Sequence, residues 1–414
     1  MSSSGAEAVP PAVIHSRGMQ RGLIALVQVL GLATWFSASA VVPMLEVEWG
    51  ISHAAAVWLT AATQLGFVAG AVASAVLGLA DRMPAHLLIA LSTLGATAFT
   101  LCFAWFANSL ALAIPLRFAT GVFLAGVYPV GMKLMASWAP PSSRARSMGL
   151  LIGALTVGSA LPHMIGTIDW DWRLLMTAAA LVTLGGGVVC IAFVRPGPFL
   201  TRSSFTPDPK YVLRMFADVR ARLVNFGYLG HMWELYALWT WLPIFAAYAL
   251  AEQSGGGGDG PSRSVMSLSA FLAIGVAGLV GALIGGWTAD RWGRPRTAAG
   301  ALIVSGACCL LSPLAFTWAP VVLLVFGAVW GASVIADSGV FSTMLSEVVD
   351  GPQAGTALTA QTAAGFLLTV VSIQIVPLFA GLVGWQWALS ILALGPVIGV
   401  VSMLGFRRLA VPVG

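Results

Sequence analysis

The stretch 223–249 holds an imidazole and a carboxyl inside an otherwise apolar and aromatic segment. Tyr228, His231 and Glu234 follow at intervals of three residues, a spacing that places them on one face of a helix. At about 1.5 Å per residue, Glu234 lies roughly 16 Å into the segment, near the middle of a membrane-length helix. A carboxyl and an imidazole held there could exchange a proton near neutral pH. We interpret Glu234 as a proton acceptor with His231 as its partner; the alternative is a structural hydrogen-bonded pair.

Two further ionisable groups are expected inside apolar stretches. A charge in the bilayer centre costs about 2.5 kcal/mol or more, so such residues are functional candidates by default. Asp337 lies towards the cytoplasmic end of the stretch 320–345, and we expect it to take part in proton coupling. Lys133 could pair with Asp337 across the two halves of the chain when the inner side is shut. The alternative is that each pairs locally, with the lysine reaching the headgroups.

Arg117 is the candidate for contact with a charged solute, because it lies in the outer half of the stretch 110–136. A guanidinium can hold a carboxylate through two parallel hydrogen bonds, or it can tune a neighbouring carboxyl. Other polar or aromatic side chains are placed where they could line a cavity or bridge helices as hydrogen-bonding amides. These candidate solute contacts are Gln28, Trp35, Tyr228, Trp239 and Gln361.

The composition indicates that these residues lie in helices that cross a membrane. Of 414 residues, 58% are hydrophobic and 8% charged, against roughly 25% charged in soluble domains. A membrane helix needs about 20 predominantly apolar residues. Twelve stretches meet this need, which predicts an all-α membrane protein: 22–44, 52–80, 85–107, 110–136, 146–168, 173–194, 223–249, 266–289, 296–317, 320–345, 355–380 and 386–408.

The positions of Lys and Arg predict the orientation, because cytoplasmic loops are enriched in both. With the N-terminus inside, almost all of the 20 basic residues lie at the cytoplasmic side; the exceptions are Arg117, Arg173 and Arg263. Twelve crossings return the C-terminus to the same side. We therefore expect a multi-pass protein of the cytoplasmic (inner) membrane with both termini cytoplasmic. Its net charge of +5 then reflects contact with membrane lipid rather than a nucleic-acid partner.

A polar, basic segment divides the stretches into two sets of six. The predicted organisation is a cytoplasmic tail, a first bundle, a cytoplasmic linker, a second bundle and a short tail. These parts are residues 1–21, 22–194, 195–222, 223–408 and 409–414.

A short charged turn occurs once in each half, each time between two apolar stretches. The first copy is Leu77-Gly78-Leu79-Ala80-Asp81-Arg82, and the second runs from Gly286 to Arg294. A carboxylate in such a turn is attracted to the positive end of a neighbouring helix. It could act as a latch on the cytoplasmic side, or as a static clamp of the turn. The candidate gating residues in these turns are Asp81, Arg82, Asp290, Arg291 and Arg294. Lys133 is a further gating candidate because it could pair with Asp337.

These turns resemble the signature Gly-x-x-x-Asp-Arg-x-Gly-Arg of the major facilitator superfamily. The copy from Gly286 to Arg294 is intact, whereas the first copy has Leu77, Pro84 and Ala85 where the signature has Gly, Gly and Arg. Arg117 and Gly121 are similar to the family's Arg-x-x-x-Gly motif. The resemblance implies two pseudo-symmetric six-helix bundles around a central cavity, transport by alternating access, and a monomer.

We therefore expect a secondary active transporter of a small organic solute, coupled to protons, with a slight preference for export of an amphipathic compound. The alternatives are proton-coupled uptake of a small organic anion held by Arg117, and an uncoupled facilitator. No nucleophile motif, phosphate-binding loop or Cys/His metal spacing occurs in the sequence. We therefore do not expect the protein to be an enzyme or a sensor, and we expect neither a cofactor nor a metal site. Its expected partners are a small-molecule solute, protons and lipid.

Overall fold

The computed structural model of the chain describes residues 16–140, 144–168, 170–199, 215–253, 263–349 and 354–410, without the side chains of residues 53–54, 80–81, 263–265 and 410. Every regular element among these residues is helical. The predicted all-α class is therefore confirmed.

The first half of the chain forms a series of helices separated by short turns. In chain order they are α1 (Arg17–Gly31), α2 (Ser37–Trp49), α3 (His53–Ala56), α4 (Trp58–Leu77), α5 (Leu79–Arg82), α6 (Ala85–Phe106), α7 (Leu110–Leu124), α8 (Tyr128–Trp138), α9 (Arg144–Ile165) and α10 (Trp172–Phe193).

The second half begins with the longest helix. It contains α12 (Val219–Gln253), α13 (Arg263–Ala270), a π-helix (Phe271–Val276), α14 (Ala277–Trp292), α15 (Arg294–Ala315), α16 (Pro320–Ile335), α17 (Ser338–Val348), α18 (Ala354–Val383), α19 (Trp385–Ala388), a 3₁₀ turn (Leu389–Ala393) and α20 (Leu394–Ala410).

Ten helical segments of the described chain are long and apolar enough to cross a membrane. Two of the predicted twelve stretches are not among them. The stretch 22–44 is interrupted between α1 and α2, and the stretch 223–249 lies within the 35-residue α12. The first is divided into helices of 15 and 13 residues, each too short to cross alone, and the second carries polar residues such as His231 and Glu234 in its interior.

Two helix starts lie inside segments that were predicted to be tail or linker. Helix α1 begins at Arg17, within the predicted tail 1–21, and α12 begins at Val219, within the predicted linker 195–222. Residues 1–15 and 200–214 lie outside the described part of the chain. The division into tails, bundles and linker stays a prediction.

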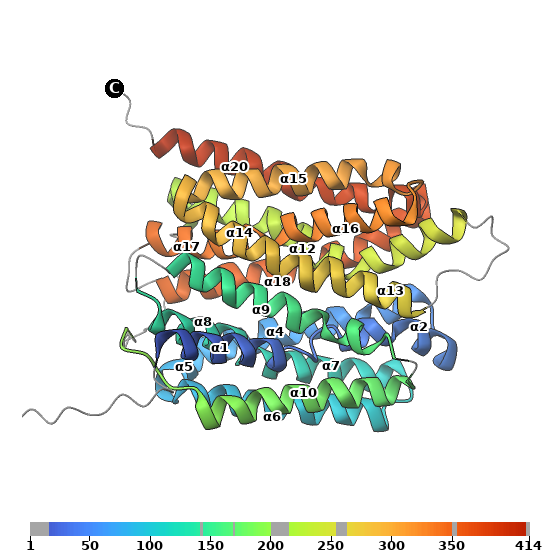
Figure 1. Cartoon of the computed structure of the whole chain (residues 1–414), viewed down its shortest axis with the longest axis horizontal. Coiled ribbons are helices and arrows are strands. Elements are labelled where there is room, and N and C mark those ends of the chain that lie inside the picture. The colour runs from blue at the N-terminus through green and yellow to red at the C-terminus, as the bar shows by residue number, and fades with distance from the viewer. Residues whose placement is uncertain are drawn as a thin grey trace, which may run out of the picture.

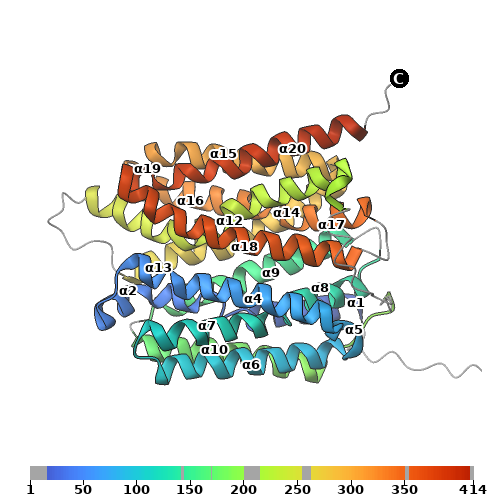
Figure 2. The same ribbon diagram turned by 180° about the vertical axis from the view of Figure 1, so that it is seen from behind.

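The helices lie side by side, roughly along one axis, with the first half of the chain in the lower part of Figure 1 and the second half in the upper part. Helix α9 packs on α14 and on the π-helix, and α4 packs on α18, so two pairs of helices join the halves. Figure 2 shows the second of these pairs from behind. In both views the start of α1 and the end of α20 lie at the same end of the molecule.

Glycines bring the two halves close together at the α9–α14 contact. A Cβ at Gly149 would lie 2.7 Å from the carbonyl oxygen of Ala282, and one at Gly286 would lie 3.0 Å from that of Ala145. Small residues of this kind let membrane helices approach closely. Near the other end of α9, a Cβ at Gly166 would lie 3.1 Å from Ser267 Oγ. The halves therefore touch along the length of α9, which meets α14 near one end and α13 near the other.

Three of the long apolar stretches are interrupted near their middle. The interruptions are residues 32–36 between α1 and α2, 125–127 between α7 and α8, and 336–337 between α16 and α17. The last two lie at corresponding positions of the two halves. Interrupted helices free backbone carbonyl and N–H groups inside the membrane, and such groups commonly form transport sites.

Candidate functional site

Arg117 is fully buried and bridges to the interruption between α1 and α2. Its Nη2 donates to the carbonyl oxygens of Thr34 (3.0 Å) and Trp35 (2.9 Å), and its Nη1 donates to Ser37 Oγ (3.3 Å). The interruption leaves these carbonyls without helical partners, so the guanidinium satisfies them. No carboxylate lies within ion-pair distance of Arg117 in the described chain, and its Nε has no hydrogen-bond partner there. A positive charge is thus held deep in the molecule without a counter-charge.

Gln28 makes the reciprocal contact. From α1, its Nε2 donates 3.2 Å to the carbonyl oxygen of Val127, within the interruption between α7 and α8. The amide lies against Gly131, where a Cβ would come within 2.2 Å of Gln28 Nε2. Each interrupted stretch therefore supplies a side chain that donates to carbonyl oxygens in the other's interruption, although the carbonyl oxygen of Val127 also accepts from the backbone N–H of Gly131. Gln28 Oε1 is buried without a partner in the described chain, and the predicted solute contact of Gln28 stays a prediction.

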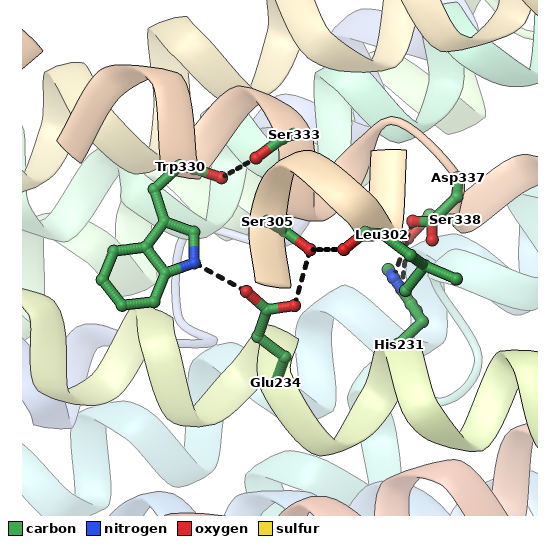
Figure 3. A network of polar contacts seen from close by, with 8 residues as sticks. All are labelled: His231, Glu234, Leu302, Ser305, Trp330, Ser333, Asp337 and Ser338. Carbon is green, nitrogen blue, oxygen red and sulfur yellow. Dashed lines mark hydrogen bonds and ion pairs between the residues drawn. The ribbon is translucent and has the colours of Figure 1, made fainter. Parts of the chain in front are cut away.

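The interruption between α16 and α17 holds the second charged site. Asp337 and His231 are each 1% exposed, and His231 Nδ1 lies 2.8 Å from Asp337 Oδ1. Figure 3 shows the imidazole of His231 directed from α12 towards Asp337 and Ser338. Its Nε2 lies 2.8 Å from Ser338 Oγ. His231 and Asp337 are close enough for an ion pair, but their atoms are not aligned for a hydrogen bond. The carboxylate of Asp337 therefore has no hydrogen-bond donor in the described chain.

Glu234 lies in a separate polar network one turn further along α12. Its Oε1 accepts from Trp330 Nε1 (2.6 Å) and from Cys309 Sγ (3.3 Å), and its Oε2 accepts from Ser305 Oγ (2.8 Å). The carboxyl is 1% exposed and points between α15 and α16, as Figure 3 shows. Three donors from two helices hold the carboxyl in one place. This arrangement braces the second half.

One predicted pairing is wrong. His231 is not the partner of Glu234: the two side chains leave α12 towards different helices, although they are three residues apart. Asp337 lies at ion-pair distance from His231, and its pairing with Lys133 when the inner side is shut stays a prediction. The spacing of three residues fixes only a shared helix face, whereas the ends of the side chains follow the donors on neighbouring helices.

Two of the predicted solute contacts meet in a buried aromatic cluster between the halves. We call it the aromatic cluster; it consists of Trp35, Phe36, Phe67, Tyr236, Trp239 and Phe366. The other four rings were not among the predicted solute contacts. Aromatic residues at helical spacing are usual in any apolar core, and only the interruption at 32–36 brings Trp35 and Phe36 towards α12.

The other predicted solute contacts lie on the packed surfaces of α12 and α18. Gln361 Nε2 donates to Asn225 Oδ1 at 3.2 Å. Tyr228 lies against His231, with 6.2 Å between ring centroids. Tyr228 therefore lies beside His231, the partner of Asp337, whereas Gln361 lies on α18 and contacts α12 at Asn225.

One of the predicted gating residues joins the two halves. Asp290, at the end of α14, forms an ion pair of 3.5 Å with Arg146, in the first turn of α9. Arg294 instead binds Glu347 at the end of α17, and Arg291 lies over the ring of Trp287. The side chain of Asp81 lies outside the described part of the chain, and Arg82 ends α5. The sequence motif did not point to Arg146 or Glu347.

The Glu234 network makes a prediction about stability. Replacing Glu234 by Ala leaves the buried N–H of Trp330 without an acceptor, and we expect the free energy of unfolding to fall by about 1–3 kcal/mol. Glu234→Gln should fall much less. Its amide oxygen can accept from Trp330, and its NH₂ can donate to Ser305, whose hydroxyl can turn to the carbonyl of Leu302.

Thermal unfolding of the detergent-solubilised protein checks this order. An exposed carboxyl on the same helix, Glu252, is the control, and Glu252→Ala should leave the unfolding temperature unchanged. Equal stability of Glu234→Ala and the native chain would show that the network does not brace the second half.

Comparison with protein families places these features in context. A family model described as the Major Facilitator Superfamily matches residues 24–371, which include α9, α12 and both charged sites.

The curated relatives are transporters from bacteria. The chain is 25% identical to a probable sulfoacetate transporter of Cupriavidus necator, over 73% of this chain and 74% of that protein. It is 25% identical to a gallate transporter of Pseudomonas putida, over 65% and 64%. A niacin transporter of Acinetobacter baylyi is 24% identical over 69% of this chain and 70% of its own length.

Proposed function

This chain belongs to the Major Facilitator Superfamily, and we propose that it takes up a small organic anion together with protons. Membership of a transporter family makes it a multi-pass membrane transporter and not an enzyme. The observation that carries the proposal is the buried guanidinium of Arg117, which no carboxylate of the described chain neutralises.

Anion transport fits both the site and the relatives. A buried cation without a counter-charge favours an anionic ligand, because isolated buried charges are costly. The relatives' names specify sulfoacetate, gallate and niacin, compounds that carry a sulfonate or a carboxyl group. A small solute with a carboxylate or sulfonate group is the substrate class that Arg117 could hold through its two-pronged donor set.

Proton coupling is assigned to Asp337 and His231. A carboxyl and an imidazole 2.8 Å apart, at an interrupted helix in the membrane interior, can share or release one proton. We assign Glu234 a supporting part, because its carboxyl is already held by three donors. Proton-coupled entry also moves an anion inwards against the membrane potential, for which the proton supplies the charge.

The architecture that we propose is the one expected from the sequence. Adding the interrupted pair α1–α2 and the long α12 to the ten apolar spans gives twelve crossings in two six-helix bundles. The start of α1 and the end of α20 lie at the same end of the molecule, which supports cytoplasmic positions for both termini. We further propose a monomer in the cytoplasmic membrane, in contact with lipid.

Two other transport modes make different predictions. Export of an amphipathic compound, the direction slightly preferred from the sequence, would appear as proton-driven movement of the solute out of the cell rather than accumulation inside. An uncoupled facilitator would move the anion only down its own gradient. It would show no dependence on an imposed pH difference.

The test is uptake by proteoliposomes of labelled benzoate, nicotinate and sulfoacetate, each with and without an inward proton gradient. Protein-free vesicles measured in parallel remove passive entry of the weak acids. We expect at least one anion to accumulate only when the gradient is present. Entry without accumulation would identify a facilitator, and no entry of any anion would contradict the proposal.

Removing the Arg146–Asp290 ion pair should modestly raise how often the two halves separate at the proposed cytoplasmic side. Exposed ion pairs contribute about 0.2–1 kcal/mol, so Asp290→Asn should open this side up to about 5-fold more often. Val340 lines the crevice between α9, α14 and α17, so a cysteine at Val340 in a cysteine-free background reports the opening. Asp290→Asn should label faster with a maleimide, and the double exchange Arg146→Asp, Asp290→Arg should restore the native rate. An unchanged rate in Asp290→Asn would identify a static clamp.

A further inference from the structure

The aromatic cluster is a contact between the halves that the charged sites leave unexplained. Trp35, Phe36 and Phe67 come from the first half, and Tyr236, Trp239 and Phe366 from the second. None of the six side chains is more than 3% exposed. The carbonyl oxygen of Trp35 also accepts from Arg117, at 2.9 Å. The cluster therefore adjoins the proposed anion contact.

The rings face one another across the halves in nearly parallel pairs. Trp35 stacks on Tyr236 with 6.0 Å between centroids and 23° between planes. Phe36 stacks on the same Tyr236 at 5.9 Å and 14°. A planar ring inserted between two such faces needs two contact layers of about 3.5 Å each, or about 7 Å. A small separation of the halves therefore produces a slot that fits a flat ring.

The cluster also contains buried donors that have no acceptor in the part of the chain that the structure describes. The indole N–H groups of Trp35 and Trp239 are buried without a hydrogen-bond partner in the described chain, and so is Nε of the adjoining Arg117. All three are donors. Buried donors without partners are rare and cost free energy. A carboxylate offers only acceptors, so it is the group that best complements such a set.

We propose that the aromatic cluster is the ring-binding part of the solute site, and that the transported anion is an aromatic carboxylate. This inference rests on the proposed function, because it names the class of organic anion that is transported. The ring of the substrate takes a place between Trp35 and Tyr236 when the halves separate. Its carboxylate accepts from Arg117 and from an indole N–H of the cluster. Flat rings are favoured over saturated ones because stacking requires a π face.

The test compares two acids that share a carboxylate and a six-membered ring. Benzoate is planar, and cyclohexanecarboxylate is saturated. In proteoliposomes we expect the KM for labelled benzoate to be about 5-fold lower than the inhibition constant of cyclohexanecarboxylate, the ratio that stacking of this kind contributes. Because the ratio is measured in one preparation, it does not depend on how much protein is folded.

Three variants separate the ring contact from the carboxylate contact. Trp35→Leu removes a stacking face, and should bring the preference for benzoate close to one. Trp239→Phe keeps a ring but removes an N–H, and should weaken both acids alike without changing the preference. The control is Trp49→Leu, in an aromatic group with Phe103 and Trp172 that lies within the first half. It should keep the native preference.

The outcomes distinguish this inference from the function on which it rests. Equal affinity for the two acids in the native chain, or a preference for the saturated one, would overturn the aromatic assignment. Transport of sulfoacetate but not of benzoate would also overturn it and leave anion transport standing. If no organic anion is transported, both proposals fail. A native preference that Trp49→Leu abolishes and Trp35→Leu keeps would place the ring elsewhere.

Discussion

Replacing Arg117 by Gln is expected to lower kcat/KM for uptake of the anion on the order of 100-fold, because hydrogen bonds to a charged group contribute about 1.5–3 kcal/mol each. The amide carries no charge, and it cannot reach the carbonyl oxygens of both Thr34 and Trp35 while also holding a carboxylate. Arg117→Lys should keep part of the activity, since it keeps the charge but not the two-pronged donor set.

The control for this variant is Arg173→Gln. Arg173 is another arginine of the first half, but it is bound to Glu48 at 2.8 Å on the exposed surface. Initial rates of labelled uptake over a range of concentrations give KM and kcat separately. A folded Arg117→Gln protein with native kcat/KM would show that Arg117 serves only the interruption between α1 and α2.

Replacing Asp337 by Asn is expected to abolish accumulation driven by the proton gradient. The amide cannot take up a proton, so the His231–Asp337 contact loses its titratable carboxyl. Exchange of labelled for unlabelled anion across the membrane should continue, because exchange needs no net proton movement. The expected result is therefore a separation of two activities rather than loss of both.

Measuring both activities in one preparation provides the internal control for protein amount. Glu252→Gln, at the exposed end of α12, should keep both. Glu234→Gln should keep accumulation if its network only braces the second half. If Glu234→Gln abolishes accumulation and Asp337→Asn does not, the proton is carried by Glu234, as the sequence alone had suggested.

The general plan of the fold could be read from the sequence because it depends on local composition. Apolar stretches of membrane length predict helices wherever they occur, and the repeated charged turn indicates two similar halves. The interruption at 32–36 could not be predicted, since it contains neither proline nor glycine. It is stabilised from a distant helix, by the hydrogen bonds of Arg117 to Thr34 and Trp35.

The candidate site shows the same division. Rarity of charge in an apolar chain was enough to single out Arg117, His231, Glu234 and Asp337. Their partners could not be predicted, because they come from other helices. Trp330 and Ser305 bind Glu234 from α16 and α15, and Ser338 binds His231 at an interruption that has no proline or glycine between α16 and α17.

The most direct test of anion–proton cotransport is proton movement into proteoliposomes that contain a pH-sensitive dye. An inward gradient of benzoate is applied at equal pH on both sides, and protein-free vesicles supply the baseline. The account predicts acidification of the lumen above that baseline with the native chain, and none above it with Asp337→Asn. The account would be contradicted if benzoate entered through the native protein while the proton flux was no larger than with Asp337→Asn.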